Sequence, residues 1–385
     1  MLEEQIQMVD LHGQYLRFKE EIDEAMQAVI DSCAFINGPQ VKSFAGHLAD
    51  YLQVPYVIPC GNGTDALQIA LMALELQPGD EVILPAFTYI AAAEVVALLG
   101  LTPVLVDVDP RSFNIDPRKI EAAVSGRTKA IVAVHLFGQA CDMEPIMTLA
   151  DAYHLYVVED NAQSIGADYT FSDGRVRKAG TIGHIGTTSF FPSKPLACYG
   201  DGGALMTSDE ALAARIRMIA NHGQECKYHH RWIGCNSRLD TLQAAVLDVK
   251  LKHLGEFTET RRQVASRYDD ALSSCDSLVL PARSAVLSSC LSSIYGPGKR
   301  RQAECPSMPV ERTGNPFHDL LSSTSASSGS LSAYLPCIRQ FGRLHPFVRI
   351  RPFPADSYGN VPRTTAIYNR NSKKGGVSKL SCSRA

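Results

Sequence analysis

Short apolar runs alternate with longer amphipathic runs along the chain between Pro55 and Asp160. The short runs are rich in β-branched residues and predict strands at 56–59, 81–85, 103–108, 130–135 and 155–160. The longer runs repeat apolar residues every three or four positions and predict helices at 65–76, 116–124 and 143–153. A further helix is predicted to run through residues 95–100. This alternation is typical of an α/β protein with a largely parallel sheet, helices on both faces and right-handed crossovers.

Two more helices are predicted before this region. Apolar residues three or four positions apart predict an amphipathic helix from Tyr15 to Ile30. A Gly-Pro turn follows at 35–41, and a second helical pattern runs to Leu52.

Lys194 follows an apolar, β-prone run that ends in Ser189-Phe190-Phe191, and turn residues flank it in the sequence FFPSKP. A long amine held in a turn between buried segments costs stability unless it has a function. One such function is a Schiff base with an aldehyde cofactor, because burial and neighbouring cations lower the amine's pKa and make it nucleophilic. A surface lysine in an ordinary loop is the alternative.

Asp160 ends the buried run LYVVED, at the carboxyl end of a predicted strand. Ligand contacts in α/β sheets lie at such strand ends. Pyridoxal phosphate (PLP) needs an acid there, since a carboxylate against the pyridine nitrogen keeps the nitrogen protonated and makes the ring an electron sink. Asp160 could instead cap the turn that follows it.

The turn Cys60-Gly61-Asn62-Gly63-Thr64 lies between the first predicted strand and its helix. Small residues there bring backbone N–H groups to the positive end of the helix dipole, which favours phosphate binding. A tight turn that requires glycine is the alternative. Tyr89 offers a flat face on which a pyridine ring can stack, or it packs in the core. Gln163 follows Asp160 closely enough to hydrogen-bond the phenolic oxygen of the same cofactor.

Five motifs follow one another over the first 245 residues. They are GNGTDAL at 61–67, PAFTYIAAA at 85–93, VVEDNAQSIGA at 157–167, TTSFFPSKPLACYGDGGA at 187–204 and GCNSRLDTLQAA at 234–245. In order and spacing they resemble the DegT/DnrJ/EryC1/StrS family, which are PLP-dependent aminotransferases acting on nucleotide-linked keto sugars. The resemblance runs from about Met8 to about Leu272. It implies the type I fold of PLP-dependent transferases, related to aspartate aminotransferase.

The resemblance also implies roles for these residues. Lys194 forms the internal aldimine with PLP and, once freed, moves a proton between the substrate carbon and the cofactor. Asp160 keeps the ring cationic, and Tyr89 stacks on it. The cofactor phosphate is held by the residues aligned with Gly63, Thr64 and Ser189. A dehydratase branch of the family has histidine in place of the lysine, and Lys194 argues against that branch.

The segment from Arg215 to Ala245 is expected to be a helix, a polar loop with several histidines and another helix. These histidines lack metal-ligand spacing and accompanying cysteines, so we expect no metal site. In the family this loop crosses to the partner subunit, so the resemblance implies a homodimer with shared active sites. The residue aligned with Asn236 then reaches the neighbour's cofactor phosphate, and His229 and His230 are expected to contact the substrate.

Arg238 follows Asn236 by two positions and is expected to bind a carboxylate of the sugar. A guanidinium matches the planar carboxylate of a uronic acid. An ion pair with Asp240 or Glu225 is the alternative.

The composition is that of an ordinary enzyme large enough to bury a sizeable core. The chain has 385 residues, 45% of them hydrophobic and 20% charged. It contains no run of about 18 apolar residues, and its N-terminus has no signal-peptide pattern. We therefore expect a cytoplasmic protein with no membrane or nucleic-acid partner. The 11 cysteines form no C-x-x-C pair, so reduced thiols are expected.

The net charge of −3 hides an uneven distribution. Up to Cys275 there are 22 basic and 35 acidic residues; from Asp276 onward there are 15 and 5, a local balance of +10. We expect residues 1–250 to form a large PLP-binding domain and residues 251–385 to be the remnant of a small domain. From about residue 275 the family pattern is missing and serine is abundant, so we expect poor order there. A reading-frame shift after about Ser274 would explain the change; a lineage-specific basic tail is the alternative.

Together these features predict transfer of an amino group, with L-glutamate as the expected donor, to the keto carbon of a nucleotide sugar. Within the family, the motifs are most similar to those of enzymes for UDP-2-acetamido-3-keto-glucuronic acid in bacterial surface polysaccharide synthesis. A non-catalytic PLP-binding or regulatory protein is the alternative, because the C-terminal portion departs from the family pattern.

Overall fold

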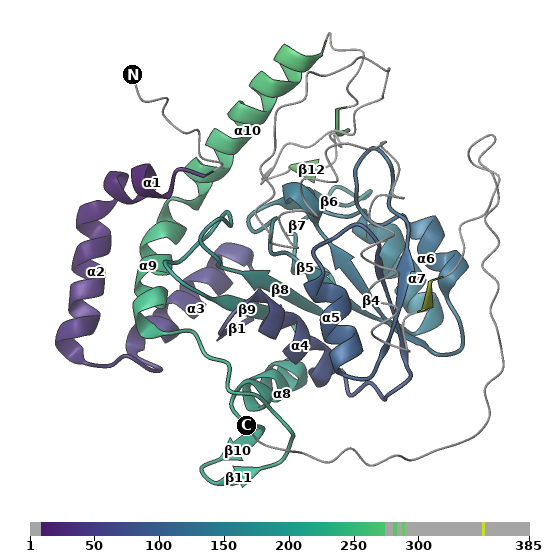
Figure 1. Cartoon of the computed structure of the whole chain (residues 1–385), viewed down its shortest axis with the longest axis horizontal. Helices are drawn as coiled ribbons and strands as arrows, with labels where there is room; N and C mark the ends of the chain where they lie inside the picture. The colour runs from purple at the N-terminus through teal and green to yellow at the C-terminus, as the bar shows by residue number, and fades with distance from the viewer. Residues whose placement is uncertain (1–8, 274–279, 283–286, 289–348, 351–385) are drawn as a thin grey trace, which may run out of the picture. The chain divides into compact units, whose positions relative to one another are not determined.

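The computed structural model describes residues 9–273, 280–282, 287–288 and 349–350 (Figure 1). All of them lie in one compact unit, Met1–Arg351. The expected poor order after about residue 275 falls almost entirely outside the described residues. The expected domain boundary at residue 250 and the reading-frame hypothesis stay predictions.

A central sheet organises the described part of the chain. Its strands are β1 (Tyr56–Cys60), β2 (Glu81–Pro85), β3 (Thr102–Val106), β4 (Thr128–Val134), β5 (Tyr156–Asp160), β8 (Ile185–Ser189), β9 (Gly203–Thr207) and β13 (Arg349–Ile350). They are ordered β1-β9-β8-β5-β4-β2-β3-β13. Neighbouring strands pair in parallel except that β9 is antiparallel to both β1 and β8. The predicted α/β fold with a mostly parallel sheet is confirmed.

Helices cover both faces of this sheet (Figure 1). One face packs against α4 (Gly63–Ala73), α5 (Ala91–Leu98) and α8 (Glu210–Ala220). The other packs against α3 (Pro39–Leu52), α6 (Pro117–Ala123), α7 (Met143–Tyr153) and α9 (Thr241–Lys252). Successive strand side chains point to opposite faces, so Val82 and Leu84 lie in one apolar cluster and Ile83 in the other. The strands are buried on both sides, which explains their continuous apolar runs.

The N-terminal helical segment differs from the prediction. One helix was expected from Tyr15 to Ile30, but α1 (Leu11–Arg17) and α2 (Lys19–Ser32) are separated at Phe18, whose φ is −120° and ψ 22°. The buried Phe18 ring lies 4.1 Å from the His253 ring and 5.6 Å from the Phe257 ring, measured between centroids. These contacts come from the start of α10 (Leu254–Leu272) and the residue before it. Long-range packing therefore overrides the local helical pattern.

The remaining elements are short. A three-stranded sheet pairs β12 (Leu287–Ser288), β6 (Asp168–Thr170) and β7 (Val176–Lys178), and a hairpin pairs β10 (Gln224–Cys226) with β11 (His229–His230). A 3-10 turn, η1, spans Leu136–Gly138. In the part of the chain that is described, no helix has the length and apolar character needed to cross a membrane.

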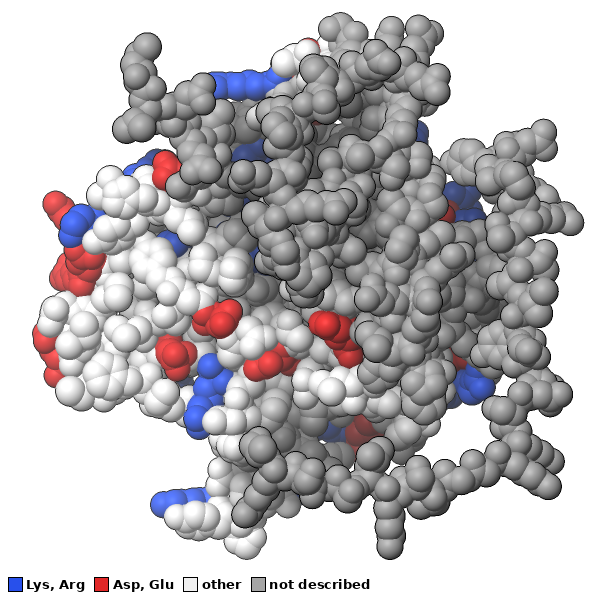
Figure 2. Space-filling model, in the orientation of Figure 1, with Lys and Arg blue, Asp and Glu red and all other residues white. Residues whose placement is uncertain are grey.

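Charged side chains are mixed on the face shown in Figure 2. There the visible Lys and Arg side chains of the described residues are scattered among Asp and Glu side chains, not gathered into one patch.

Candidate active site

The candidate site residues lie mainly where parallel strands of the central sheet end. Strands β2, β4, β5 and β8 run in one direction, and β1 runs the same way because β9 is antiparallel to both β1 and β8. Their carboxyl ends share one edge of the sheet, where α/β folds bind ligands. The loop after β1 carries Gly63, the loop after β2 carries Tyr89, and the loop after β8 carries Lys194.

The glycine turn after β1 begins α4. Asn62 caps the helix, since its Oδ1 accepts the Asp65 N–H at 2.8 Å. A Cβ placed on Gly63 would lie 2.6 Å from the Cβ of Ser189, the last residue of β8. The structure thus brings Gly63 and Ser189, 126 positions apart in sequence, into contact at a helix N-terminus. Thr64 follows on the same helix turn and is exposed.

Ser237 connects this turn to the segment that contains Asn236 and Arg238. Its hydroxyl accepts the Gly61 N–H at 2.8 Å and donates to the Asp65 carboxylate at 2.6 Å. The side chain is buried, and these two bonds satisfy its hydroxyl. Ser237 and Asp65 both lie within the quoted motifs, but their spacing of 172 positions gave no signal that they meet.

Lys194 and Asp160 influence each other electrostatically. Burial lowers the pKa of the Lys194 amine, and the Asp160 carboxylate opposes this effect. Burial likewise raises the pKa of Asp160, opposed by a hydrogen bond from the Ala162 N–H at 3.0 Å and by Lys194. The Lys194 backbone N–H donates to Phe191 O at 2.8 Å, which closes the expected turn. Lys194 is therefore a partly buried amine within electrostatic reach of a carboxylate, as expected for a functional lysine more than for a fully exposed one.

Asp160 also makes the contact that its capping alternative predicts, because its Oδ1 accepts a backbone N–H two residues ahead. That bond uses one oxygen and leaves the carboxylate's other lone pairs, so capping and a ligand contact are compatible.

Gln163 and Tyr89 lie on different loops of the same edge. The Oε1 atom of Gln163 accepts the N–H of Phe137 at 2.6 Å, and Phe137 has a left-handed backbone with φ 56°. This bond orients the Gln163 amide and supports a backbone conformation that phenylalanine rarely adopts. Tyr89 is 73% exposed, so the alternative of a core aromatic is wrong.

The loop after α8 holds the remaining predicted residues. Asn236 is exposed and forms an isolated bridge with Asn221. His229 and His230 form β11, and His230 Nδ1 hydrogen-bonds His222 O at 2.9 Å. Figure 1 shows this hairpin beyond α8, away from the central strands. Across the described ranges, no group of three or more His, Cys, Asp and Glu side chains is arranged to hold a metal ion.

Arg238 makes no side-chain hydrogen bond or ion pair with any residue in the described part of the chain. Glu225, one of its two alternative partners, instead pairs with Arg231 at 3.1 Å. Arg238 is partly buried and follows Ser237, which contacts the glycine turn.

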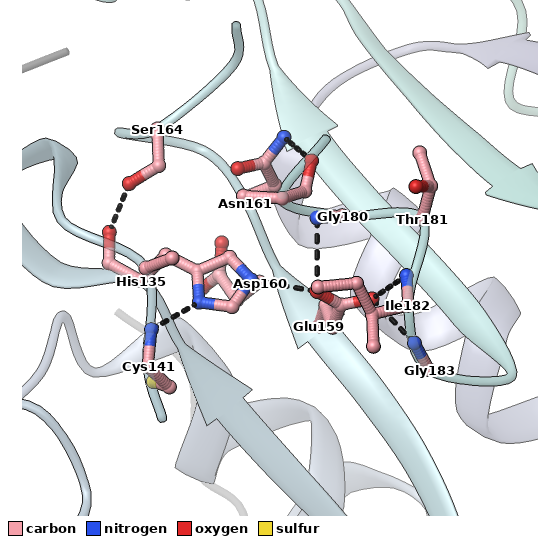
Figure 3. Close-up of polar contacts among 12 residues, drawn as sticks. His135, Cys141, Glu159, Asp160, Asn161, Ser164, Gly180, Thr181, Ile182 and Gly183 are labelled. Carbon is pink, nitrogen blue, oxygen red and sulfur yellow. Dashed lines mark hydrogen bonds and ion pairs between the residues drawn. The ribbon is translucent and has the colours of Figure 1, made fainter. Parts of the chain in front are cut away.

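A buried pair behind Asp160 was not predicted. His135, which follows β4, and Glu159, in β5, are fully buried and hydrogen-bonded at 2.8 Å (Figure 3). Two features of the sequence could have indicated this pair: Glu159 is a carboxylate inside an apolar strand, and His135 follows the neighbouring strand. His184 accepts the Val157 N–H at 3.0 Å through Nδ1.

Fold and site together define the class of protein, an aminotransferase with the fold of PLP-dependent enzymes. The sequence profile of the DegT/DnrJ/EryC1/StrS aminotransferase family matches residues 17–301. The chain therefore belongs to this family, and its enzyme class is that of the family's sugar aminotransferases. The match continues past Leu272, where the motif resemblance was expected to stop.

Individual relatives agree with this assignment. A UDP-2-acetamido-2-deoxy-3-oxo-D-glucuronate aminotransferase of Pseudomonas aeruginosa is 51% identical over 267 residues, covering 69% of this chain and 73% of the relative. A pleiotropic regulatory protein of Geobacillus stearothermophilus is 48% identical over 263 residues, covering 68% and 69%. The crystal structure of a DegT DnrJ EryC1 StrS aminotransferase from Brucella abortus has a TM-score of 0.73 and 42% identity, and covers 77% of this chain and 80% of that one.

Proposed function

We propose that this enzyme transfers the amino group of L-glutamate to the keto carbon of UDP-2-acetamido-3-oxo-glucuronate. In this exchange the amino acid becomes a 2-oxo acid while the keto sugar becomes an amino sugar. The observation that carries the proposal is the sheet edge that holds the Gly63–Ser189 contact together with Lys194 and Asp160, an amine and a carboxylate that influence each other's pKa. The 51% identity to the P. aeruginosa enzyme supports the choice of sugar. The product would serve bacterial surface polysaccharide synthesis, such as that of lipopolysaccharide O-antigen, in the cytoplasm.

The residues present fit PLP. Gly63 offers a backbone surface without a side chain, beside the Ser189 hydroxyl and at the positive end of α4, as a phosphate requires. Lys194 supplies an amine for the aldehyde, Asp160 a carboxylate for the ring nitrogen, and Tyr89 an exposed ring for stacking. When bound, PLP supplies an electron sink and carries the amino group between the donor and the sugar.

Lys194 would act as the proton carrier. Because burial lowers its pKa, a larger fraction of the amine is neutral near pH 7 than for an exposed lysine. A neutral Nζ can accept the proton released from the substrate carbon, and the resulting ammonium can return it. Asp160, as a carboxylate, would stabilise a positive charge on the ring nitrogen.

A homodimer with shared active sites is part of the proposal. The loop that carries Asn236 also exposes two large apolar side chains, Tyr228 at 81% and Ile233 at 88%. Two large exposed apolar side chains on one loop are compatible with a protein contact there. A second copy would bury them and bring Asn236 to its neighbour's cofactor phosphate, with Arg238, His229 and His230 contacting the sugar.

Turnover by the purified full-length chain tests the proposal. The chain is mixed with PLP, L-glutamate and either UDP-2-acetamido-3-oxo-glucuronate or the corresponding neutral 3-keto sugar, and formation of 2-oxoglutarate is followed. We expect turnover with the uronate and none in Lys194→Ala. Bound PLP without turnover of either sugar would instead support the alternative of a non-catalytic PLP-binding or regulatory protein.

A further inference from the structure

Glu159 is a fully buried carboxylate that the proposed chemistry does not use. Such a group is costly to bury unless several donors satisfy it. Its Oε2 accepts His135 Nε2–H at 2.8 Å and the Gly180 N–H at 2.9 Å, while Oε1 accepts the Ile182 and Gly183 N–H groups, each at 2.6 Å (Figure 3). Burial alone would raise the pKa of Glu159, but these donors outweigh it and hold the pKa below its ordinary value. Glu159 is therefore ionised.

The tautomer of His135 follows from its two neighbours. The Cys141 backbone N–H donates to Nδ1 at 3.0 Å, so Nδ1 carries no proton. The ring proton must then lie on Nε2, from which it is donated to Glu159. The orientation of the His135 ring is thus fixed on both sides.

The main chain of His135 holds the turn that presents Asp160. Its N–H donates to Asp160 O at 3.0 Å. Its C=O accepts the Ser164 hydroxyl at 2.6 Å (Figure 3). These bonds fix both ends of the 160–164 turn, which also carries Gln163.

The loop that donates to Glu159 holds the same turn from the other side. The Asn161 side chain donates to Ala179 O at 2.9 Å, and a Cβ on Gly180 would lie 2.7 Å from Asn161 Nδ2. Glu159 therefore connects three segments around Asp160: the end of β4, the end of β5 and the loop that enters β8.

We propose that Glu159 and His135 are positioning residues that fix the direction of the Asp160 carboxylate toward the cofactor-binding edge. This inference rests on the proposed function in one respect, because it takes Asp160 to face the cofactor ring. Neither residue would touch the cofactor or the substrate.

Glu159→Gln is the direct perturbation. The amide matches the carboxylate in shape, but its NH₂ group would face two donors, Gly180 N–H and His135 Nε2–H. Glu81→Gln is the matched control: Glu81 is also a buried carboxylate, paired with Arg127 at 2.6 Å, but it lies at the amino end of β2, on the opposite edge of the sheet. Both variants lose a buried charged acceptor, and only Glu159 is linked to Asp160.

Three measurements separate positioning from stability: the urea midpoint, the PLP dissociation constant, and the pH dependence of the bound cofactor's absorbance. We expect both variants to unfold at lower urea concentration. Only Glu159→Gln should weaken PLP binding, on the order of tenfold by analogy with residues that orient the ligands of metal sites. Only this variant should shift the pH midpoint of the bound cofactor's absorbance. Equal PLP affinity and spectra in the two variants would overturn the proposal.

A conservative variant covers the case in which Glu159→Gln does not fold. His135→Gln can donate to Glu159 through its NH₂ and accept from Cys141 N–H through its oxygen, whereas His135→Leu can do neither. We expect PLP affinity close to wild type in the first and weakened in the second; equal affinities would contradict the pair's role.

Hydrogen exchange in the cofactor-free protein separates failure of this inference from failure of the proposed function. Amides of 160–164 and 179–183 should lose protection in Glu159→Gln but keep it in Glu81→Gln. If the wild-type chain binds no PLP, the proposed function is wrong. The exchange data would still show whether Glu159 holds the 160–164 turn.

Discussion

Replacing Arg238 with alanine tests which sugar the site recognises. The guanidinium makes no ion pair or hydrogen bond with the described residues, and its alternative partner Glu225 pairs with Arg231. Truncation therefore breaks no internal pair, and we expect the free energy of unfolding to change by less than about 0.5 kcal/mol. A charge-assisted bond to a uronate carboxylate contributes about 1.5–3 kcal/mol, which corresponds to about ten- to over a hundredfold in affinity.

The assay compares kcat/KM for the 3-keto uronate and the matching neutral 3-keto sugar in wild type, Arg238→Ala and Arg231→Ala. Arg238→Ala should lower kcat/KM for the uronate by about ten- to over a hundredfold. It should leave kcat/KM for the neutral sugar nearly unchanged. Arg231→Ala breaks an exposed pair on the same loop and should leave the ratio between the sugars as it is. Equal losses for both sugars in Arg238→Ala would refute the reasoning and leave Arg238 a structural residue.

Three further predictions concern Gly63 in the proposed phosphate site, Asp160 opposite the proposed ring nitrogen, and the buried amine of Lys250. Gly63→Ala should destabilise the protein by about 1–3 kcal/mol in urea unfolding and weaken PLP, because its Cβ would lie 2.6 Å from Ser189 Cβ, while Gly126→Ala, with open space at its Cβ, should do neither. Asp160→Asn should keep some PLP bound but lose most transamination, since an amide cannot stabilise a protonated ring nitrogen; near-wild-type turnover would contradict this role. Lys250 is buried over the Tyr199 ring, its Nζ has no hydrogen-bond partner in the described part of the chain, and burial lowers its pKa from 10.5 to about 8. Between these two pH values the unfolded chain binds a proton that the folded chain lacks, so the free energy of unfolding should rise with pH by about 3 kcal/mol in total. Lys250→Met should remove that rise. The same slope of unfolding free energy against pH in wild type and variant would contradict this prediction.

The central sheet could be predicted because its signals are local. Strands buried on both faces give continuous apolar runs, and the helices between them repeat every three or four residues. The break at Phe18 could not be predicted in this way, because its cause is packing against His253 and Phe257, more than 230 positions away.

The candidate site could be predicted in part. Lys194, Asp160 and Gly63 each follow a strand, and parallel strands place their carboxyl ends together. The bond from Ser237 to Asp65 joins two motifs that carry no shared pattern. The tautomer of His135 depends on the Cys141 N–H, a backbone group that sequence does not identify as a partner.

The most direct test of the account is to find where the cofactor attaches. The full-length protein is loaded with PLP, reduced with borohydride and digested, and the labelled peptide is identified by mass spectrometry. The account predicts a yellow protein that is bleached by reduction, with the label on Lys194 and no label on that peptide in Lys194→Ala. The same reducible colour in Lys194→Ala, or a label on another lysine in wild type, would contradict the assignment of Lys194 as the cofactor-binding residue.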